Sequence, residues 1–341
     1  MLNPIDYSVI KDIPELSGME FLKNKNGSFF KLTKDEYNVL ADLIRDENPI
    51  TVNKRNPPYS GNNFLDDVFI KSEEYTKLRS LLLAKKNIIL QGAPGVGKTY
   101  AAKRLAYSMM GVKDPERVQL VQFHQSYSYE DFVEGFRPSS TGMNFEIKKG
   151  AFYNFCKKAS DDKENEYFFI IDEINRGNLS KIFGELFMLI EADKRGNDIQ
   201  LLYSSDKFSV PKNVYIIGMM NTADRSLAMI DYALRRRFAF YEMKPAFESE
   251  GFREYQFGLE NDKFNKLIDC VISLNQRIAD DDSLGEGFCI GHSYFCDIEE
   301  IKENTLTDIV EFEIIPLLKE YWFDEPSKVK EWSDRLRSAV K

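Results

Sequence analysis

At 341 residues the chain is long enough for about two domains with cores of their own, and its 43% hydrophobic content is typical of a globular protein. The net charge of −9 argues against a broad basic face that grips a nucleic-acid duplex, although a local basic pore stays open. No apolar run approaches the ~18 residues of a membrane helix, and no signal peptide is visible. We therefore expect no membrane contact. Scattered cysteines indicate free thiols in a reducing cytoplasm, where we expect the protein to act: Cys156, Cys270, Cys289 and Cys296.

Residues 1–60 predict a small α+β appendage that ends in a linker. A helix is expected over residues 35–44, where Thr33 and Glu36 can form a capping box at the first turn. Residues 53–63 are rich in Asn, Pro and Gly, which favours a linker. Short strands are expected before the helix, at residues 14–21 and 27–32.

Residues 61–245 predict an α/β nucleotide-binding domain in which strands alternate with helices. Continuous apolar runs favour buried parallel strands, and the alternation is typical of a doubly wound, mostly parallel sheet. The strands are expected at residues 87–91, 117–123, 167–171, 214–220 and 238–241, the helices at 72–85, 99–107 and 179–192, and a hairpin insertion at 199–210.

Residues 246–341 predict a smaller helical domain that acts as a lid. The strand signal fades after Pro245, and apolar residues recur at helical spacing over 264–279 and 306–322.

The run Gly92–Thr99 matches G-x-x-x-x-G-K-[ST], the phosphate-binding loop of P-loop NTPases. Lys98 would reach the β- and γ-phosphates, and the Thr99 hydroxyl would hold Mg²⁺. A chance glycine loop on the surface is the alternative, and the strand–loop–helix context argues against it. The residues expected to contact the nucleotide here are Gly92, Ala93, Pro94, Gly95, Val96, Gly97, Lys98, Thr99 and Tyr100.

An acidic pair, Asp172 and Glu173, follows the apolar run at 167–171. At the end of a buried strand, Asp172 would bind Mg²⁺ and Glu173 would polarise the attacking water. A solvated strand end is the plainer alternative, and the P-loop upstream favours the catalytic interpretation.

Polar side chains also follow the strand at 214–220. Asn221 can hydrogen-bond the attacking water or the γ-phosphate, and Asp224 with Arg225 could orient it. Taken alone, these residues are better explained by an Asx-turn with an exposed ion pair.

Three consecutive arginines, Arg235, Arg236 and Arg237, form a further candidate site. Arg236 and Arg237 are favoured as arginine fingers offered to a neighbouring subunit, because the guanidinium fork matches phosphate oxygens. A solvated helix end, where cations are favoured, is the alternative.

The order of these elements resembles the AAA+ superfamily, and individual stretches resemble the McrB family, the motor subunits of modification-dependent restriction systems. The string Asn-Thr-Ala-Asp-Arg-Ser at 221–226 is that family's own signature. The resemblance covers roughly residues 62–330 and leaves residues 1–60 aside. It is carried by the stretches at residues 92–99, 121–132, 172–178, 220–226, 232–238 and 290–295.

This resemblance implies a Mg²⁺-dependent GTPase that forms a homo-oligomeric, hexameric ring. It also implies an McrC-like endonuclease subunit that stimulates hydrolysis and cleaves DNA while the ring translocates. DNA contact is expected through an N-terminal reader or the ring pore, and residues 1–60 are short for a complete reader. By position, the implied roles are P-loop for Lys98 and Thr99, Walker B for Asp172 and Glu173, sensor 1 for Asn221 and trans-acting arginines for Arg236 and Arg237.

Several assignments stay open at this point. Arg176 lies inside a family motif and is either an inter-subunit or supporting cation or a surface arginine. The base is expected to pack near Phe69 and Ile70, and the preference for GTP over ATP rests on the family likeness alone. His292 stands where AAA+ lids often carry a second sensor, usually arginine. Two rival functions remain: an ATP-hydrolysing remodeller of the MoxR type, and a nucleotide-gated assembly scaffold.

Overall fold

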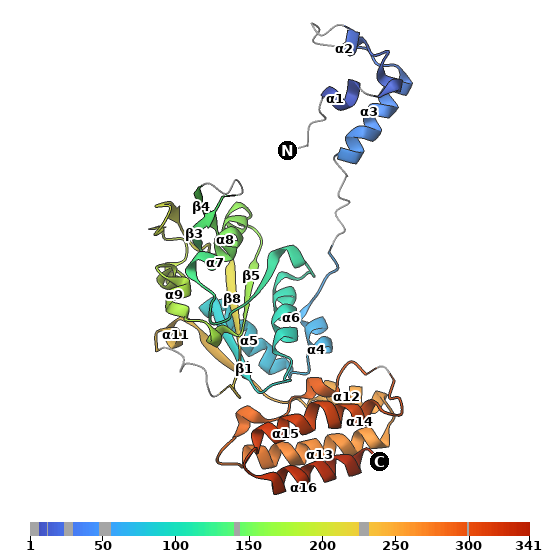
Figure 1. Ribbon diagram of the computed structural model, residues 1–341, viewed down its shortest axis with the longest axis vertical. Helices are drawn as coiled ribbons and strands as arrows, with labels where there is room; N and C mark the ends of the chain where they lie inside the picture. The colour runs from blue at the N-terminus through green and yellow to red at the C-terminus, as the bar shows by residue number, and fades with distance from the viewer. Residues whose placement is uncertain are drawn as a thin grey trace. The chain divides into compact units, whose positions relative to one another are not determined.

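The chain forms two compact units, Met1–Asn56 and Pro57–Lys341. The computed structural model describes residues 7–11, 13–23, 30–47, 56–139, 144–224, 232–298 and 300–341. The first unit, blue in Figure 1, is helical in its described part: α1 (Tyr7–Lys11), a 3₁₀ turn (Pro14–Leu16), α2 (Glu20–Lys23) and α3 (Lys34–Glu47).

The capping box expected in this unit is confirmed. The N–H of Glu36 donates to Thr33 Oγ1 at 3.2 Å, and the N–H of Thr33 donates to Glu36 Oε2 at 2.7 Å. The strand expected at residues 14–21 is wrong, because its buried residues, Leu16 and Met19, are spaced three apart as in a helical turn. Of the second expected strand, the described residues 30–32 are not in a strand, and the rest lies outside the described residues.

The second unit is built on a five-stranded parallel sheet in the order β2-β5-β8-β1-β9, as Figure 1 shows for its central strands. This confirms the doubly wound, parallel sheet. The strand expected at 167–171 lies in the interior of the sheet, since it pairs on both sides. The strands are β1 (Asn87–Gly92), β2 (Val118–Gln122), β5 (Tyr167–Asp172), β8 (Val214–Asn221) and β9 (Ala239–Met243).

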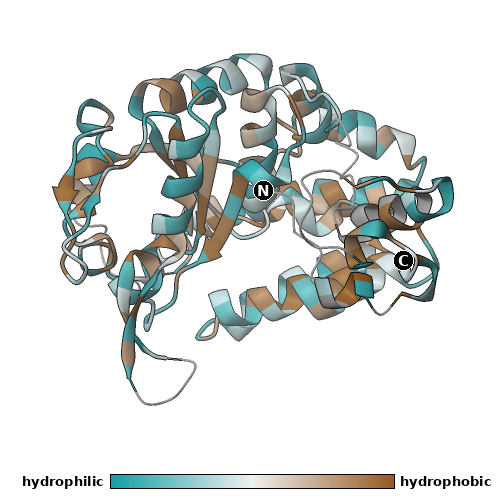
Figure 2. Cartoon of the chain, turned by 90° about the horizontal axis from the view of Figure 1, so that it is seen from above, coloured by the Kyte–Doolittle hydropathy of each residue, from teal (hydrophilic) through white to brown (hydrophobic). Residues whose placement is uncertain are grey.

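Alternate residues of the three inner strands, β5, β8 and β1, enter two different cores, which is why these strands are largely apolar. Ile88 and Leu90 pack into the core that includes α6, whereas Ile89 between them packs into the core that includes α8. Much of the sheet is accordingly brown in Figure 2. The helices on the two faces are α4 (Gly61–Asp67), α5 (Ser72–Lys85), α6 (Lys98–Met110) and α8 (Ala151–Asp161).

The junction before the sheet differs from the expected linker. Tyr59 is 2% exposed and belongs to the core, and Ser60 caps α4, which begins at Gly61. Residues 58–63 therefore belong to the second unit, because the Tyr59 ring is buried in the core of that unit.

Two hairpins are inserted in the sheet domain. The hairpin expected at 199–210 is confirmed as β6 (Ile199–Gln200) and β7 (Lys207–Phe208), and a second one, β3 (Glu134–Pro138) with β4 (Phe145–Lys149), was not anticipated. The helix expected at 179–192 is interrupted at Gly184, whose φ of +51° and close approach to the Tyr129 ring suit glycine alone. The interrupted stretch forms α9 (Leu179–Phe183), α10 (Leu186–Leu189) and a 3₁₀ turn (Ala192–Lys194). Tyr129, whose ring approaches Gly184, begins α7 (Tyr129–Phe132).

The C-terminal part is a helical lid, orange to red in Figure 1. It has its own apolar core, around Trp322, Phe264 and Leu274. No helix among the described residues has the length and apolarity that a membrane crossing requires. The lid and the short helix before it contain α11 (Tyr232–Arg237), α12 (Glu250–Gly258), α13 (Asp262–Ala279), α14 (Thr305–Asp308), a π turn (Ile309–Ile314), α15 (Ile315–Tyr321) and α16 (Pro326–Ala339).

Candidate active site

The predicted site residues follow three neighbouring strands of the sheet. β1 ends in the glycine loop, β5 ends at Asp172 and β8 ends at Asn221. Gly92 lies opposite Asn221 in the parallel register. Because the carboxyl ends of parallel strands share one edge, the sheet brings the glycine loop, the acidic pair and the polar strand end together.

The glycine loop has the backbone that its sequence predicts. Gly95 and Gly97 have φ values of +76° and +74°, in the left-handed region where glycine is favoured. A Cβ on Gly92 would lie 2.3 Å from the carbonyl oxygen of Met243, so this position also excludes a side chain. The loop then leads directly into α6 at Lys98, whose N-terminal amides suit an anion.

Lys98 folds back onto its own loop. Its Nζ donates to the carbonyl oxygens of Gly92 and Ala93 at 3.0 and 2.9 Å. Burial lowers the pKa of Lys98 to about 8, and the carboxylates of Glu173 and Asp172 oppose that shift. A phosphate group would therefore gain a cation that is already desolvated and held in place.

Glu173 is the centre of a charged cluster. Asn221 Nδ2 donates to Glu173 Oε1 at 2.9 Å, and Arg176 Nε lies 3.1 Å from Glu173 Oε2. Arg176 also donates to Asp224 at 3.1 Å. The carboxylate of Glu173, and to a smaller extent that of Asp224, raises the pKa of the Arg176 guanidinium. Arg176 therefore joins two acidic side chains in this structure, whereas Arg225, the partner expected for Asp224, lies outside the described residues.

The side chains expected to hold Mg²⁺ supply two oxygen donors, the carboxylate of Asp172 and the hydroxyl of Thr99. Within the described part of the chain, no group of three His, Cys, Asp or Glu side chains could hold a metal ion. Mg²⁺ in nucleotide sites takes one or two carboxylates, a hydroxyl and phosphate oxygens, which Asp172 and Thr99 would complement.

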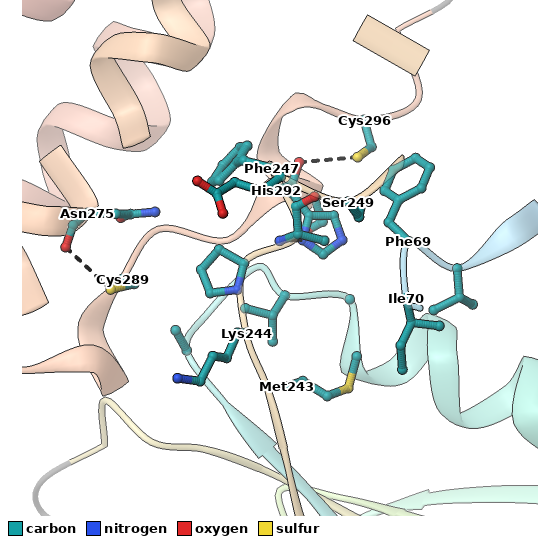
Figure 3. A pocket seen from close by; sticks show the side chains of 18 of the residues that line it. Phe69, Ile70, Met243, Lys244, Phe247, Ser249, Asn275, Cys289, His292 and Cys296 are labelled. Carbon is teal, nitrogen blue, oxygen red and sulfur yellow. Dashed lines mark hydrogen bonds between the residues drawn. The ribbon is translucent and has the colours of Figure 1, made fainter. Parts of the chain in front are cut away.

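A cavity of about 780 Å³ lies between the glycine loop and the lid (Figure 3). Phe69 and Ile70, expected near the base, line it together with Val96, Gly97 and Tyr100. The lid and its approach contribute residues that the sequence did not identify, among them Met243, Phe247, Ser249, Asn275 and Cys289.

The lid is joined to the glycine loop through backbone atoms. The N–H of Gly291 donates to Pro94 O at 3.1 Å, and the N–H of Ser293 donates to Gly95 O at 2.8 Å. A Cβ on Gly291 would lie 1.9 Å from the carbonyl carbon of Gly95. Residues 290–295, one of the stretches that resemble the McrB family, therefore contact the glycine loop from the lid side.

His292 lies inside this contact, 8% exposed, among the rings of Phe69, Phe247 and Phe252. Its Nδ1 accepts the N–H of Ala246 at 3.1 Å, and burial lowers its pKa to about 4. The ring is therefore neutral near pH 7 with its proton on Nε2, which lies 3.8 Å from the position of a Cβ on Gly97. His124, by contrast, is exposed and packs edge-on against Tyr127.

The three arginines of α11 differ in their surroundings. Arg237 Nε donates to Phe187 O at 2.8 Å, its Nη2 lies 3.1 Å from Glu191, and its guanidinium lies 4.2 Å from the centroid of the Phe187 ring. Arg235 and Arg236 are exposed. Arg237 is therefore held within its own subunit, and Arg236 is the more available of the two expected fingers.

Comparison with known proteins gives two matches along this unit. Residues 87–238 match the AAA domain of the dynein-related subfamily, and residues 266–330 match the alpha-helical lid domain of McrB. The chain is 51% identical over 284 residues to the Type IV methyl-directed restriction enzyme EcoKMcrB subunit of Escherichia coli K12, covering 80% of this chain and 61% of that protein. It is 26% identical over 234 residues to the Type II restriction enzyme BsuMI component YdiS of Bacillus subtilis, covering 58% of this chain and 62% of that protein. The chain thus spans about three fifths of the length of these relatives.

Proposed function

Because this chain carries a McrB-type AAA domain followed by a McrB lid, we propose that it is the nucleoside-triphosphatase motor of a DNA restriction system. The observation that carries the proposal is the hydrogen bond between Asn221 and Glu173 at the sheet edge where the glycine loop begins. A carboxylate and an amide that meet beside a phosphate-binding loop support a role in holding one water molecule between them. A nucleotide-gated scaffold would not need this pair.

The proposed reaction is in-line attack of water on the γ-phosphate. Glu173 polarises the water and Asn221 orients it, while Lys98 neutralises the phosphate oxygens. Thr99 and Asp172 would hold Mg²⁺, which when bound supplies further charge neutralisation. In the present arrangement Arg176 forms an ion pair with Glu173 at 3.1 Å.

We propose a homo-oligomeric, hexameric ring in which Arg236 reaches the nucleotide of the neighbouring subunit. Exposed arginines on a short helix suit this role because a permanent charge is needed at a shared site. By analogy with the name of the E. coli relative, the ring would act on methylated DNA together with another subunit. That this subunit is an McrC-like nuclease follows from the McrB likeness. GTP is the favoured substrate, a preference that comes from the McrB likeness.

Exchange of Glu173 for Gln tests the catalytic assignment. The amide keeps the size of the side chain but cannot take a proton, so nucleotide binding should persist while turnover falls by about 100-fold or more. Binding and phosphate release would be measured with GTP and with ATP, with Glu185→Gln as the control because Glu185 bonds Tyr129 away from the loop. Undiminished turnover in Glu173→Gln would refute the role.

The same measurement separates the rival functions. A clear preference for ATP would favour a remodeller of the MoxR type. Nucleotide binding without turnover in the wild-type ring, with its nuclease partner present, would favour an assembly scaffold.

A further inference from the structure

A buried polar network lies at the start of β1, at the end of the strand opposite the glycine loop. Asn87, the first residue of β1, is fully buried. Its Nδ2 donates to Ile190 O at 2.7 Å and to Arg237 O at 3.1 Å, and its Oδ1 accepts from Arg195 Nη2 at 2.6 Å. One side chain therefore joins the sheet, the segment after α10 and the end of α11.

Arg195 completes the network and is itself only 3% exposed. Its Nε donates to Ile190 O at 2.9 Å and its Nη1 to Val214 O at 3.1 Å. Within the described part of the chain its hydrogen-bond partners are carbonyl and amide oxygens, and none is a carboxylate. Burial lowers the pKa of its guanidinium to about 10, so the side chain is still charged at pH 7. A buried cation without a counter-ion is costly, which indicates that it has a specific task.

The network ends on the arginine helix. Arg237 O is the carbonyl of the last residue of α11, a position that needs a donor from elsewhere in the fold. The Arg237 side chain is held as well, by Phe187 and Glu191. These two residues flank Ile190, whose carbonyl accepts hydrogen bonds from Asn87 and Arg195. Both the backbone and the side chain of Arg237 are thus anchored, one residue away from the exposed Arg236.

We propose that Asn87 and Arg195 are positioning residues that hold α11 so that Arg236 reaches the nucleotide of the neighbouring subunit. The inference rests on the proposed function, because it requires a shared site in a ring. Its distinctive consequence is that a defect at Asn87 harms the neighbour's site and leaves the subunit's own glycine loop able to work.

Asn87→Asp is the first variant. It keeps the oxygen that accepts from Arg195 and removes the donor to Arg237 O and to Ile190 O. Arg195→Met is the second variant and is used if the first fails to fold. It removes the guanidinium that donates to Asn87 Oδ1. Asn213→Asp is the matched control, since Asn213 Nδ2 binds the carbonyls of Ala159, Asp162 and Asn165 near the start of the neighbouring strand and does not touch α11.

We expect kcat of Asn87→Asp to fall by about 10- to 100-fold, as for a displaced catalytic group, with KM unchanged. Asn213→Asp should keep its kcat. Mixing Asn87→Asp with an excess of Glu173→Gln subunits should then restore turnover per Asn87→Asp site, because the neighbour supplies a well-placed arginine. A purely structural defect in the subunit's own site would not be rescued.

Arg236→Ala mixed with Glu173→Gln in the same way tests the shared site itself. If Arg236→Ala is rescued and neither Asn87→Asp nor Arg195→Met is, the positioning role is overturned while the proposed function stands. If Arg236→Ala is not rescued, the trans arrangement fails, and the inference fails with it. An equal loss of kcat in Asn213→Asp would also overturn the positioning role.

Discussion

At the scale of single residues, the active site depends on side chains whose local sequence reveals their type but not their partners. Glu173 follows a buried strand, which predicts a carboxylate at the sheet edge. Its contacts with Asn221 and Arg176 come from the parallel alignment of β5 and β8 and from the turn after β5. Glu173 itself has a φ of +49°, a left-handed conformation that is unusual for a residue with a side chain. Such a conformation is retained where the surroundings determine it, as at many functional sites.

The buried His292 makes the stability of the protein depend on pH. Its pKa is about 4 in the folded chain, against about 6.5 in an unfolded one. Below pH 6.5 the unfolded chain takes up a proton that the folded chain does not, so stability is lost as the pH falls from about 6.5 towards 4. This histidine should contribute a loss of about 2 kcal/mol in the free energy of unfolding between pH 7.5 and pH 5.

Urea unfolding of the wild type and of His292→Gln at both pH values measures this contribution. The difference in stability between the two proteins should shrink by that amount at pH 5. His124→Gln is the control, since His124 is exposed, and it should follow the wild type. A pH dependence that is the same with and without His292 would contradict the assignment.

At the scale of elements, the contact between the lid and the glycine loop determines whether the lid covers the cavity. Ala93 and Val96 of the loop are buried in the lid's own apolar core. Two backbone hydrogen bonds, from Gly291 and Ser293, join the same segments. The loop is therefore packed between the sheet and the lid, and a movement of the lid would be felt directly by the phosphate-binding amides.

Gly291→Ala should disrupt this contact. The new methyl group would lie 1.9 Å from the Gly95 carbonyl carbon. The atoms that it meets belong to the backbone, so they cannot move away as a flexible side chain could. We expect nucleotide affinity to fall by about tenfold or more, with a loss of stability of about 1–3 kcal/mol. Gly258→Ala is the control, because a Cβ there meets open space. Titration with a fluorescent nucleotide reports the affinity, and equal affinities for the two variants would show that the clasp is not needed.

At the scale of the whole molecule, the boundary between the two units determines what can be removed. The first unit ends at Asn56, and the second begins with residues that pack on the sheet. Tyr59 OH donates to Asp67 at 2.7 Å, and Ser60 caps α4. The few residues after the boundary are thus part of the motor's fold.

Deletion of residues 1–55 should leave the melting temperature of the remaining unit within about 2 °C of the full chain. Deletion of residues 1–60 also removes the buried Tyr59 ring and the cap of α4, which should cost about 3 kcal/mol or more. Differential scanning calorimetry of the two truncated proteins distinguishes these outcomes. Similar melting temperatures for both would mean that Tyr59 does not stabilise the fold.

The sequence by itself determined the features that depend on local chemistry. The glycine loop, the continuous apolar strands and the capping box at Thr33 each follow from backbone conformation, burial or a hydrogen bond within a few residues. The same local reasoning failed at residues 14–21, where a helical spacing of Leu16 and Met19 was read as strand. It also missed the interruption at Gly184, because a ring packed against that glycine comes from a distant segment.

Only the tertiary structure decided which distant residues meet. The clasp of Gly291 on the loop, the pairing of Asn221 with Glu173, and the network of Asn87 with Arg195 and Arg237 join residues about 50 to 200 positions apart. Such contacts depend on how both faces of the sheet and the lid pack, and packing is a property of the assembled cores. For that reason the chemistry of the glycine loop and the presence of a helical lid could be predicted from the sequence, whereas the contact between the lid and the loop and the anchors of the arginine helix could not.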